Sequence, residues 1–110
     1  MAIRRPARRL TMGLLALALG GAGPAVAAAT THTVIIEGMR FVPQTLTVHR
    51  GDRVVWINRD LFPHTATAGK AFDSHAIAAN ASWTHVARRA GSFGYVCSLH
   101  PGMKGTLVVQ

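Results

Sequence analysis

The sequence has a single cysteine, and this scarcity excludes one common way of stabilising a small domain. Cys97 is the only cysteine among 110 residues, so no disulfide can form within the chain. Small domains outside the cytosol are commonly held together by disulfides. A lone thiol in an oxidising compartment is reactive unless it is buried or bound to something. The cysteine count therefore favours a thiol that holds a ligand such as a metal ion.

Acidic and aromatic residues are also few. The chain has 4 Asp and Glu against 12 Lys and Arg, a formal net charge of +8, and 6% aromatic residues. Beyond residue 27 the charges are eight basic and four acidic, which leaves a net +4. These basic residues are scattered and form no stripe interleaved with stacking aromatics, so nucleic-acid binding is not predicted. A solvated surface, an anionic partner protein or an anionic membrane surface remains compatible with this charge.

No hydrophobic run is long enough to cross a membrane. The apolar run at 10–19 is half the length of the roughly 20 residues that a spanning helix needs. Four arginines (Arg4, Arg5, Arg8 and Arg9) precede it, and glycines, a proline and the small residues Ala25-Val26-Ala27 follow. This order is typical of a secretory signal. We therefore predict a signal at 1–27, a functional domain at 28–110, export to the periplasm by the general or the twin-arginine route, and no stable membrane insertion.

Helical periodicity is missing after residue 29. Short apolar alternations are instead separated by turn residues, which predicts strands at 33–36, 45–49, 53–58, 64–68, 82–87, 92–97 and 105–109. Several short strands at this spacing favour an all-β fold, either a β-sandwich rich in antiparallel pairs or a small barrel.

Two soft sulfur groups and an imidazole lie close together in the stretch "CSLHPGM". Cys97 ends a predicted strand, and His100 and Met103 follow in the predicted loop. His64 begins another predicted strand just after a turn, and loops at one end of a sandwich can meet. A cysteine, two histidines and a weak axial methionine form the ligand set of a blue-copper electron-transfer site.

Each of these residues also has an ordinary explanation. A buried cysteine acts as a small hydrophobe, a loop histidine is commonly solvated and a methionine commonly fills the core. Cys97 as a nucleophile would need a base such as His64 or His100 within reach, but no oxyanion donor or orienting acid is apparent. A structural zinc site is disfavoured because the Cys and His ligands number one short of four.

The chain resembles the cupredoxins, the small blue copper proteins that include amicyanin, plastocyanin and pseudoazurin. The likeness lies in "FVPQTLTVHRGDRVVWINRD", "PH", "GSFGYVC" and "CSLHPGMKGTLVV", and the short Cys-x2-His-x2-Met spacing is most similar to that of amicyanin. The resemblance implies a Greek-key β-sandwich of about seven to eight strands with one type 1 copper ion. His64, Cys97 and His100 would be its strong ligands and Met103 its weak axial ligand.

The same resemblance implies further roles. Asn58 would brace the ligand loops through hydrogen bonds, one of which would reach the Cys97 sulfur. The chain would be a monomer that is not an enzyme and that shuttles single electrons between redox partners. A copper carrier or storage protein with the same ligands is the alternative. Partners would dock around His100 on an apolar patch formed by Leu61, Phe62, Pro63, Leu99, Pro101 and Gly102.

The remaining histidines and one methionine have no predicted ligand role. We expect His32, His49, His75 and His85 to be surface or hydrogen-bonded histidines, with a weak second metal contact considered for His75. His85 shares a strand face with Trp83 by alternation. Met39 lies beside an early strand and is predicted to be part of the core.

Overall fold

The structure is a computed structural model, which describes residues 2–3 and 28–110. The predicted signal at 1–27 lies outside these residues, apart from positions 2 and 3. No helix long and apolar enough to cross a membrane occurs in the described part of the chain.

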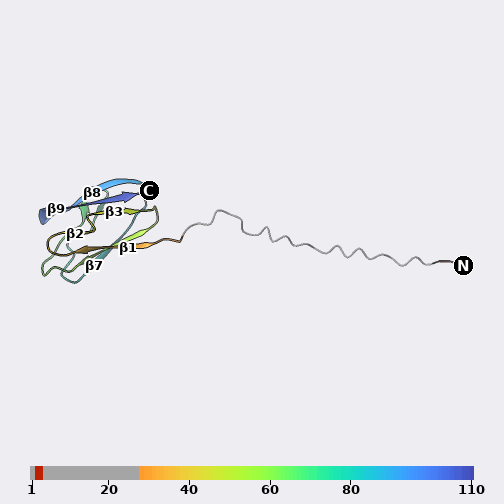
Figure 1. Ribbon diagram of the computed structural model, residues 1–110, viewed down its shortest axis with the longest axis horizontal. Coiled ribbons are helices and arrows are strands. Elements are labelled where there is room, and N and C mark those ends of the chain that lie inside the picture. The colour runs from red at the N-terminus through yellow and green to blue at the C-terminus, as the bar shows by residue number, and fades with distance from the viewer. Residues whose placement is uncertain (1, 4–27) are drawn as a thin grey trace.

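Nine strands in two sheets account for the described domain (Figure 1). They are β1 (Thr31–Ile36), β2 (Phe41–Val42), β3 (Thr45–Val48), β4 (Arg53–Asn58), β5 (Thr67–Ala68), β6 (Phe72–Asp73), β7 (Ser82–Val86), β8 (Gly91–Cys97) and β9 (His100–Val109). One sheet has the order β2-β1-β4-β7 and the other β3-β9-β8-β5-β6. The pairs β1–β4 and β3–β9 are parallel and the others antiparallel, which confirms the predicted β-sandwich.

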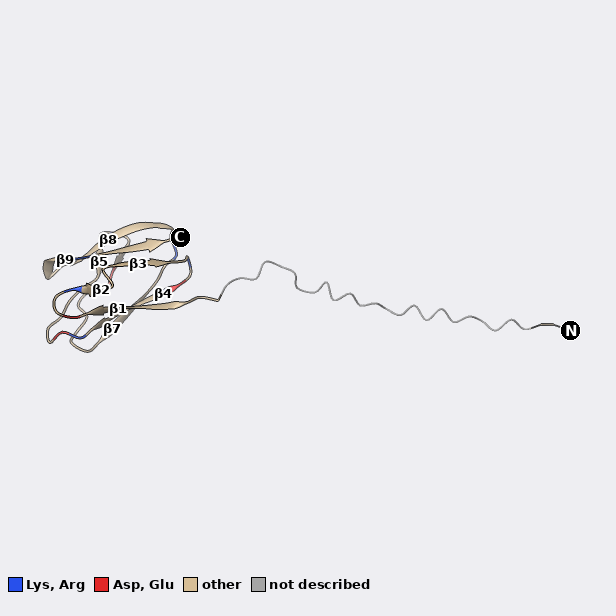
Figure 2. Ribbon diagram, viewed as in Figure 1, with Lys and Arg blue, Asp and Glu red and all other residues tan. Residues whose placement is uncertain are grey.

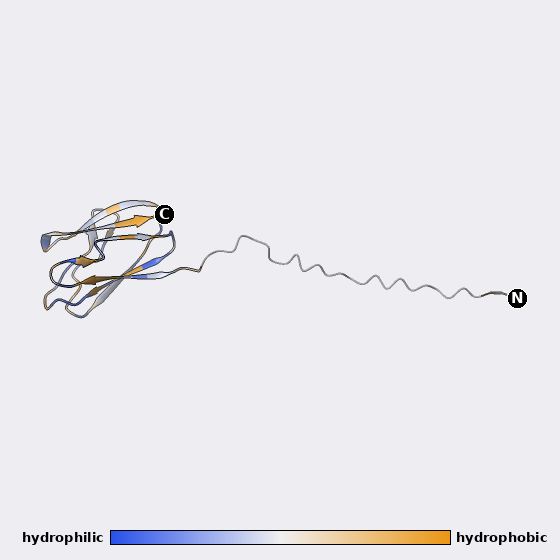
Figure 3. Ribbon diagram, viewed as in Figure 1, coloured by the Kyte–Doolittle hydropathy of each residue, from blue (hydrophilic) through white to orange (hydrophobic). Residues whose placement is uncertain are grey.

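The core follows from the alternation of side chains along the strands. On β4, Val54, Trp56 and Asn58 point inward and are buried, while the residues between them are more exposed. On β9, Met103, Gly105, Leu107 and Val109 form the buried set in the same way. Figure 3 shows the result on β9, whose second half is hydrophobic and whose start is not.

Tyr95 connects the two sheets at the centre of the core. Its ring packs edge-on against Phe41 at 4.7 Å and against Trp56 at 5.6 Å between ring centroids. On the side of its own sheet it lies against Gly105, its partner in the β8–β9 ladder. A Cβ on Gly105 would lie 2.3 Å from Cζ of Tyr95, so only glycine fits there with the ring in place.

The segment after Cys97 differs from the predicted loop. A two-residue turn at Ser98 and Leu99 pairs Cys97 directly with His100, and β9 begins at His100 rather than at 105. The next ladder pair is Val96 with Lys104, so 101–103 are extra residues without partners, a bulge on β9. Pro101 has no N–H for a ladder, and in this bulge none is needed. Because of this bulge, Met103 does not occupy the position in the β8–β9 ladder that a regular hairpin starting at His100 would give it.

The predicted strand at 64–68 is also shorter than expected. His64 forms only an isolated bridge with Ile77, and β5 begins at Thr67. This irregular stretch lies at the end of the sandwich where β9 begins, opposite the C-terminus and the entry of β1 (Figure 1). Lys and Arg are found mainly in the turns at both ends of the sandwich (Figure 2).

Candidate metal centre

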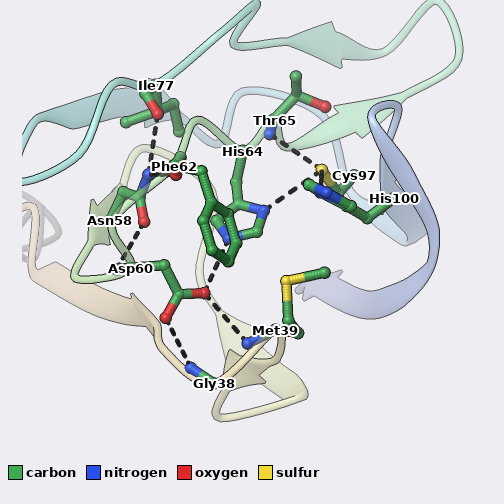
Figure 4. A network of polar contacts seen from close by, with 10 residues as sticks. All are labelled: Gly38, Met39, Asn58, Asp60, Phe62, His64, Thr65, Ile77, Cys97 and His100. Carbon is green, nitrogen blue, oxygen red and sulfur yellow. Dashed lines mark hydrogen bonds and ion pairs between the residues drawn. The ribbon is translucent and has the colours of Figure 1, made fainter.

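Three predicted ligands converge at this end of the sandwich. The Sγ of Cys97 lies 3.7 Å from Nδ1 of His64 and 3.7 Å from Nδ1 of His100. The three donor atoms all lie within 4.8 Å of one another, which makes this a cluster that could hold a metal ion. Cys97 and His64 are fully buried, and His100 is partly exposed. The hairpin turn after β8 supplies two of the donors and the 59–66 segment supplies the third (Figure 4).

The spacing of these atoms suits a single ion. Bonds of about 2.0 Å to imidazole nitrogen and about 2.3 Å to thiolate sulfur are typical of a bound transition metal such as zinc. In a trigonal arrangement such bonds place N and S roughly 3.7 Å apart, which matches the two observed separations. One thiolate, two imidazoles and a nearby thioether are the donor set that favours copper.

His64 is oriented by a carboxylate behind it. Its Nε2 donates to Oδ2 of Asp60 at 2.8 Å, so that its Nδ1 carries the free lone pair and faces Cys97. Asp60 in turn accepts bonds from the backbone N–H groups of Gly38 at 2.8 Å and Met39 at 3.1 Å. Burial acts to raise the pKa of the Asp60 carboxyl, but the N–H groups of Met39 and Gly38 and the His64 ring outweigh it and hold the pKa below its usual range.

Asn58 is the last inward-facing residue of β4, and its polar group is fully hydrogen-bonded. Its Nδ2 donates to the carbonyls of Phe62 and Ile77, both at 2.9 Å, and its Oδ1 accepts from the N–H of Asp60 at 2.9 Å. These bonds brace the loop that leads to His64, in line with the role expected for Asn58. None of them reaches the Cys97 sulfur.

Thr65 makes the bond to the sulfur instead, and the sequence interpretation missed this residue. Its backbone N–H donates to Sγ of Cys97 at 3.3 Å. Its Oγ1 accepts from the N–H of Ser98 at 2.8 Å and contacts the hydroxyls of Thr67 and Ser98. The sequence feature that could have indicated this role is the position of Thr65 directly after the ligand His64, where its backbone N–H faces the other ligands.

Met103 is buried, whereas the residues of the predicted apolar patch are exposed. Met103 is 5% exposed and belongs to the buried face of β9. Leu61, Phe62 and Leu99 are 89%, 45% and 53% exposed, and Pro63, Pro101 and Gly102 are also exposed. The Phe62 ring lies 5.9 Å from the His100 ring between centroids. The partly exposed imidazole of His100 therefore has an apolar neighbour at the surface.

The other candidate residues do not belong to this cluster, although Met39 bonds through its N–H to Asp60 beside it. His75 is exposed, contacts Asp73 and does not belong to the group that could hold a metal. His32 bonds to Asp52. His85 stacks on Trp83 and packs against Phe72, and desolvation by burial together with the nearby Arg88 lowers its pKa. Met39 is 37% exposed, so its prediction as a core residue was wrong. The reason is its position in the β1–β2 turn, where its backbone is left-handed.

Comparison with known proteins finds amicyanins and plastocyanins among the relatives of this chain. Amicyanin from Paracoccus versutus is 29% identical over 81 residues, covering 68% of this chain and 61% of that protein. Amicyanin from Paracoccus denitrificans is 32% identical over 83 residues, covering 70% and 63%. The chain thus spans less than two thirds of the length of these amicyanins. Plastocyanin from Scenedesmus fuscus is 34% identical over 84 residues, covering 64% of this chain and 86% of the plastocyanin.

Solved structures and a family profile agree with these relatives. The Cu(I) form of an amicyanin mutant superposes with a TM-score of 0.69 at 30% identity, covering 78% of this chain and 87% of that one. A purple cupredoxin from Nitrosopumilus maritimus gives a TM-score of 0.69 at 26% identity, covering 72% and 99%. The profile of the cupredoxin-like domain matches residues 9–109. The chain therefore belongs to the cupredoxin-like domain family.

Proposed function

We propose that this protein binds one copper ion through His64, Cys97, His100 and Met103 and transfers single electrons between partner proteins. The observation that carries the proposal is the convergence of the Cys97 Sγ and the two histidine Nδ1 atoms within 4.8 Å, at the end of the sandwich where Met103 is buried. The amicyanin and plastocyanin relatives support the same function. Residues 1–27 would be the secretory signal and residues 28–110 the periplasmic copper domain, acting as a monomer.

Copper, when bound, supplies the one-electron Cu(II)/Cu(I) couple. The chain's own residues fix the ligands beforehand. Asp60 holds His64 in the tautomer that offers Nδ1, and the Thr65 N–H bonds to the Cys97 sulfur. The complete burial of His64 and Cys97 keeps water away from the thiolate. Because the ligands are already oriented and shielded from water, they and their surroundings need to move little when the charge of the ion changes.

His100 is the natural route between the centre and a partner. It is the most exposed member of the ligand trio, and the exposed residues of the apolar patch (Leu61, Phe62, Pro63, Leu99, Pro101 and Gly102) would form the docking surface beside it. A small apolar contact suits weak, transient redox encounters. Exposed cations near this end, Arg40, Arg59 and Lys104, would attract an anionic redox partner at a rate that falls with added salt.

A copper carrier would need the metal to leave readily. The buried thiolate and buried imidazole support retention instead. An enzymatic role has less support, although the cupredoxin-like fold also occurs in a copper-containing nitrite reductase from Thermus scotoductus SA-01, of which this chain covers 24%.

The test is to add Cu(II) to the purified protein and record its visible spectrum, electrochemistry and copper release to a chelator. We expect an intense thiolate-to-copper band, a reversible one-electron wave and slow release. Cys97→Ser should abolish the band, and His75→Ala, a histidine outside the cluster, should leave it unchanged. A colourless wild-type protein in the presence of Cu(II) would contradict the proposed Cys97–Cu(II) site, and rapid handover to the chelator would favour the carrier.

The export proposal has its own measurement. Intact mass and N-terminal sequencing of the protein recovered from a periplasmic extract should give a chain that begins at Ala28. Sedimentation of the same sample should give a monomer. Retention of residues 1–27 in the extracted protein would contradict the signal assignment.

A further inference from the structure

Asp60 connects a backbone turn to the buried ligand histidine. One of its oxygens, Oδ1, accepts from the N–H of Gly38 at 2.8 Å. The other, Oδ2, accepts from the N–H of Met39 at 3.1 Å and from Nε2 of His64 at 2.8 Å. The Asp60 side chain is 11% exposed and that of His64 is fully buried. Figure 4 shows the carboxylate between the turn and the imidazole.

The turn is shaped to hold an anion. Gly38 and Met39 have consecutive left-handed backbones, with φ of 62° and 60°. A non-glycine residue in this region is uncommon and strained, so its conformation at Met39 requires an explanation. Successive N–H groups in such turns converge on one site and bind anions. Here the two N–H groups bind the two oxygens of one carboxylate, so that Asp60 cannot rotate away from His64.

We propose that Asp60 is a positioning residue that orients His64. Its fixed negative charge acts on the centre through the His64 ring and stabilises Cu(II) relative to Cu(I). The inference rests on the proposed copper function. A carboxylate that accepts a proton from the far nitrogen of a ligand imidazole fixes its tautomer and increases its basicity. A negative charge one imidazole away from the ion also stabilises the doubly charged state more than the singly charged one. The reduction potential should therefore be lower with Asp60 than without it.

A purely structural role would look different. In that case Asp60 would only tie the 59–64 loop to the β1–β2 turn, and removing its charge would change stability alone. Asp60→Asn separates the two roles, because the amide has the same shape and its oxygen can still accept from His64 Nε2–H. The variant loses the charge, and it also loses the bond from the Gly38 N–H, because its Nδ2 cannot accept.

The experiment measures the reduction potential of copper-loaded wild type, Asp60→Asn and Glu37→Gln. Glu37 is an exposed carboxylate beside Gly38 in the same turn, so it controls for the loss of any nearby charge. For Asp60→Asn we expect the ratio of Cu(II) to Cu(I) affinity to fall about tenfold, which raises the potential by about 59 mV. For Glu37→Gln we expect a change of less than about twofold, because the exposed charge is screened.

An unchanged potential in copper-loaded Asp60→Asn would overturn the proposal. Equal shifts in both variants would overturn it as well, since the effect would then be unspecific charge. Should Asp60→Asn not fold, nitrogen-15 spectra of the copper-free wild type decide the positioning. We expect a slowly exchanging proton on His64 Nε2, and a proton on Nδ1 instead would contradict the assignment. This measurement needs no copper, so it also separates this inference from a failure of the proposed function.

Discussion

The backbone N–H of Thr65 lies 3.3 Å from the Sγ of Cys97, a residue 32 positions further along the chain. Both residues are buried. The same threonine accepts a bond from Ser98, the residue that follows Cys97. Thr65 therefore joins the His64 segment to the β8–β9 turn through both its backbone and its side chain, and the relative position of the ligands depends on it.

Replacing Thr65 by Val tests this connection. The variant keeps the shape and the backbone N–H but removes the acceptor of the partly buried Ser98 N–H, which costs less than the roughly 1–3 kcal/mol of a fully buried donor because Ser98 is exposed. We expect a lower free energy of unfolding in urea and about tenfold faster copper release to a chelator, as is typical when groups behind a metal ligand are lost. Thr84→Val, an exposed threonine on β7, is the control. Equal effects in both variants would contradict the connecting role.

Met103 is expected to act as the weak axial ligand. Met103→Leu nearly conserves volume at this buried site, so the unfolding free energy should fall by less than about 1.5 kcal/mol. Copper should remain bound, while the reduction potential should shift, because the axial ligand tunes it. The measurement is voltammetry together with the copper content of the purified variant.

Met39→Leu is the matched control for this substitution. Met39 and Met103 are the methionines of the described domain, and Met39 is exposed in the β1–β2 turn. We expect the potential of Met39→Leu to change less than that of Met103→Leu, because the substitution keeps the Met39 N–H that bonds to Asp60. If Met103→Leu loses all copper, the axial role is wrong and the thioether is an essential ligand.

The contact between Gly105 and Tyr95 predicts a stability effect far from the metal cluster. In Gly105→Ala the new Cβ would overlap the Tyr95 ring, which is packed against Phe41 and Trp56 and has little room to move. Overpacking of this kind costs about 1–3 kcal/mol. Gly94→Ala on the neighbouring strand is the control, since a Cβ there meets nothing within 4 Å. Urea denaturation of both variants measures the difference, and equal stability would argue against a rigid ring.

The residue pattern predicted an all-β sandwich or small barrel and the convergence of His64, Cys97 and His100, and the resemblance to the cupredoxins favoured the sandwich. Alternation of apolar residues reports the buried face of a strand, so β4 and β8 could be located closely. A cysteine at a strand end with a histidine three residues later is a local pattern. Its partner His64 could be found because it follows a turn and the chain has few other candidates at a strand start.

Asp60 and Thr65 could not be found in this way, because their roles depend on tertiary contacts. Asp60 belongs to the turn "NRDLFP", where an aspartate is unremarkable, and its N–H donors come from residues 21 and 22 positions away. Thr65 acts on the sulfur through its backbone, and every residue other than proline has that N–H group. The Met39 prediction failed for a related reason: an apolar residue type does not reveal that a turn exposes it.

Asp52 is predicted to make the stability of the fold depend on acid pH. Its carboxylate accepts the backbone N–H groups of Thr30 and His49, both at 3.0 Å, and the His32 ring at 2.9 Å. The bonds from Thr30, then His49, then His32 lower the pKa of Asp52 from 3.8 to about 2, against a smaller opposing effect of burial. These contacts hold the start of β1 against the turn before β4.

The sign of the effect follows from the lowered pKa. The folded state binds this proton less readily than the unfolded chain, so the stabilisation is complete above about pH 4 and is lost as the pH falls from about 4 to about 2. Asp52→Asn should lower the urea midpoint of the copper-free protein at neutral pH and flatten its decline in this range. Glu37→Gln should keep the wild-type profile, because no side-chain hydrogen bond to Glu37 occurs among the described residues. A decline as steep in Asp52→Asn as in wild type would assign the acid sensitivity to another carboxylate, with Asp60 the first to examine because its pKa is also lowered.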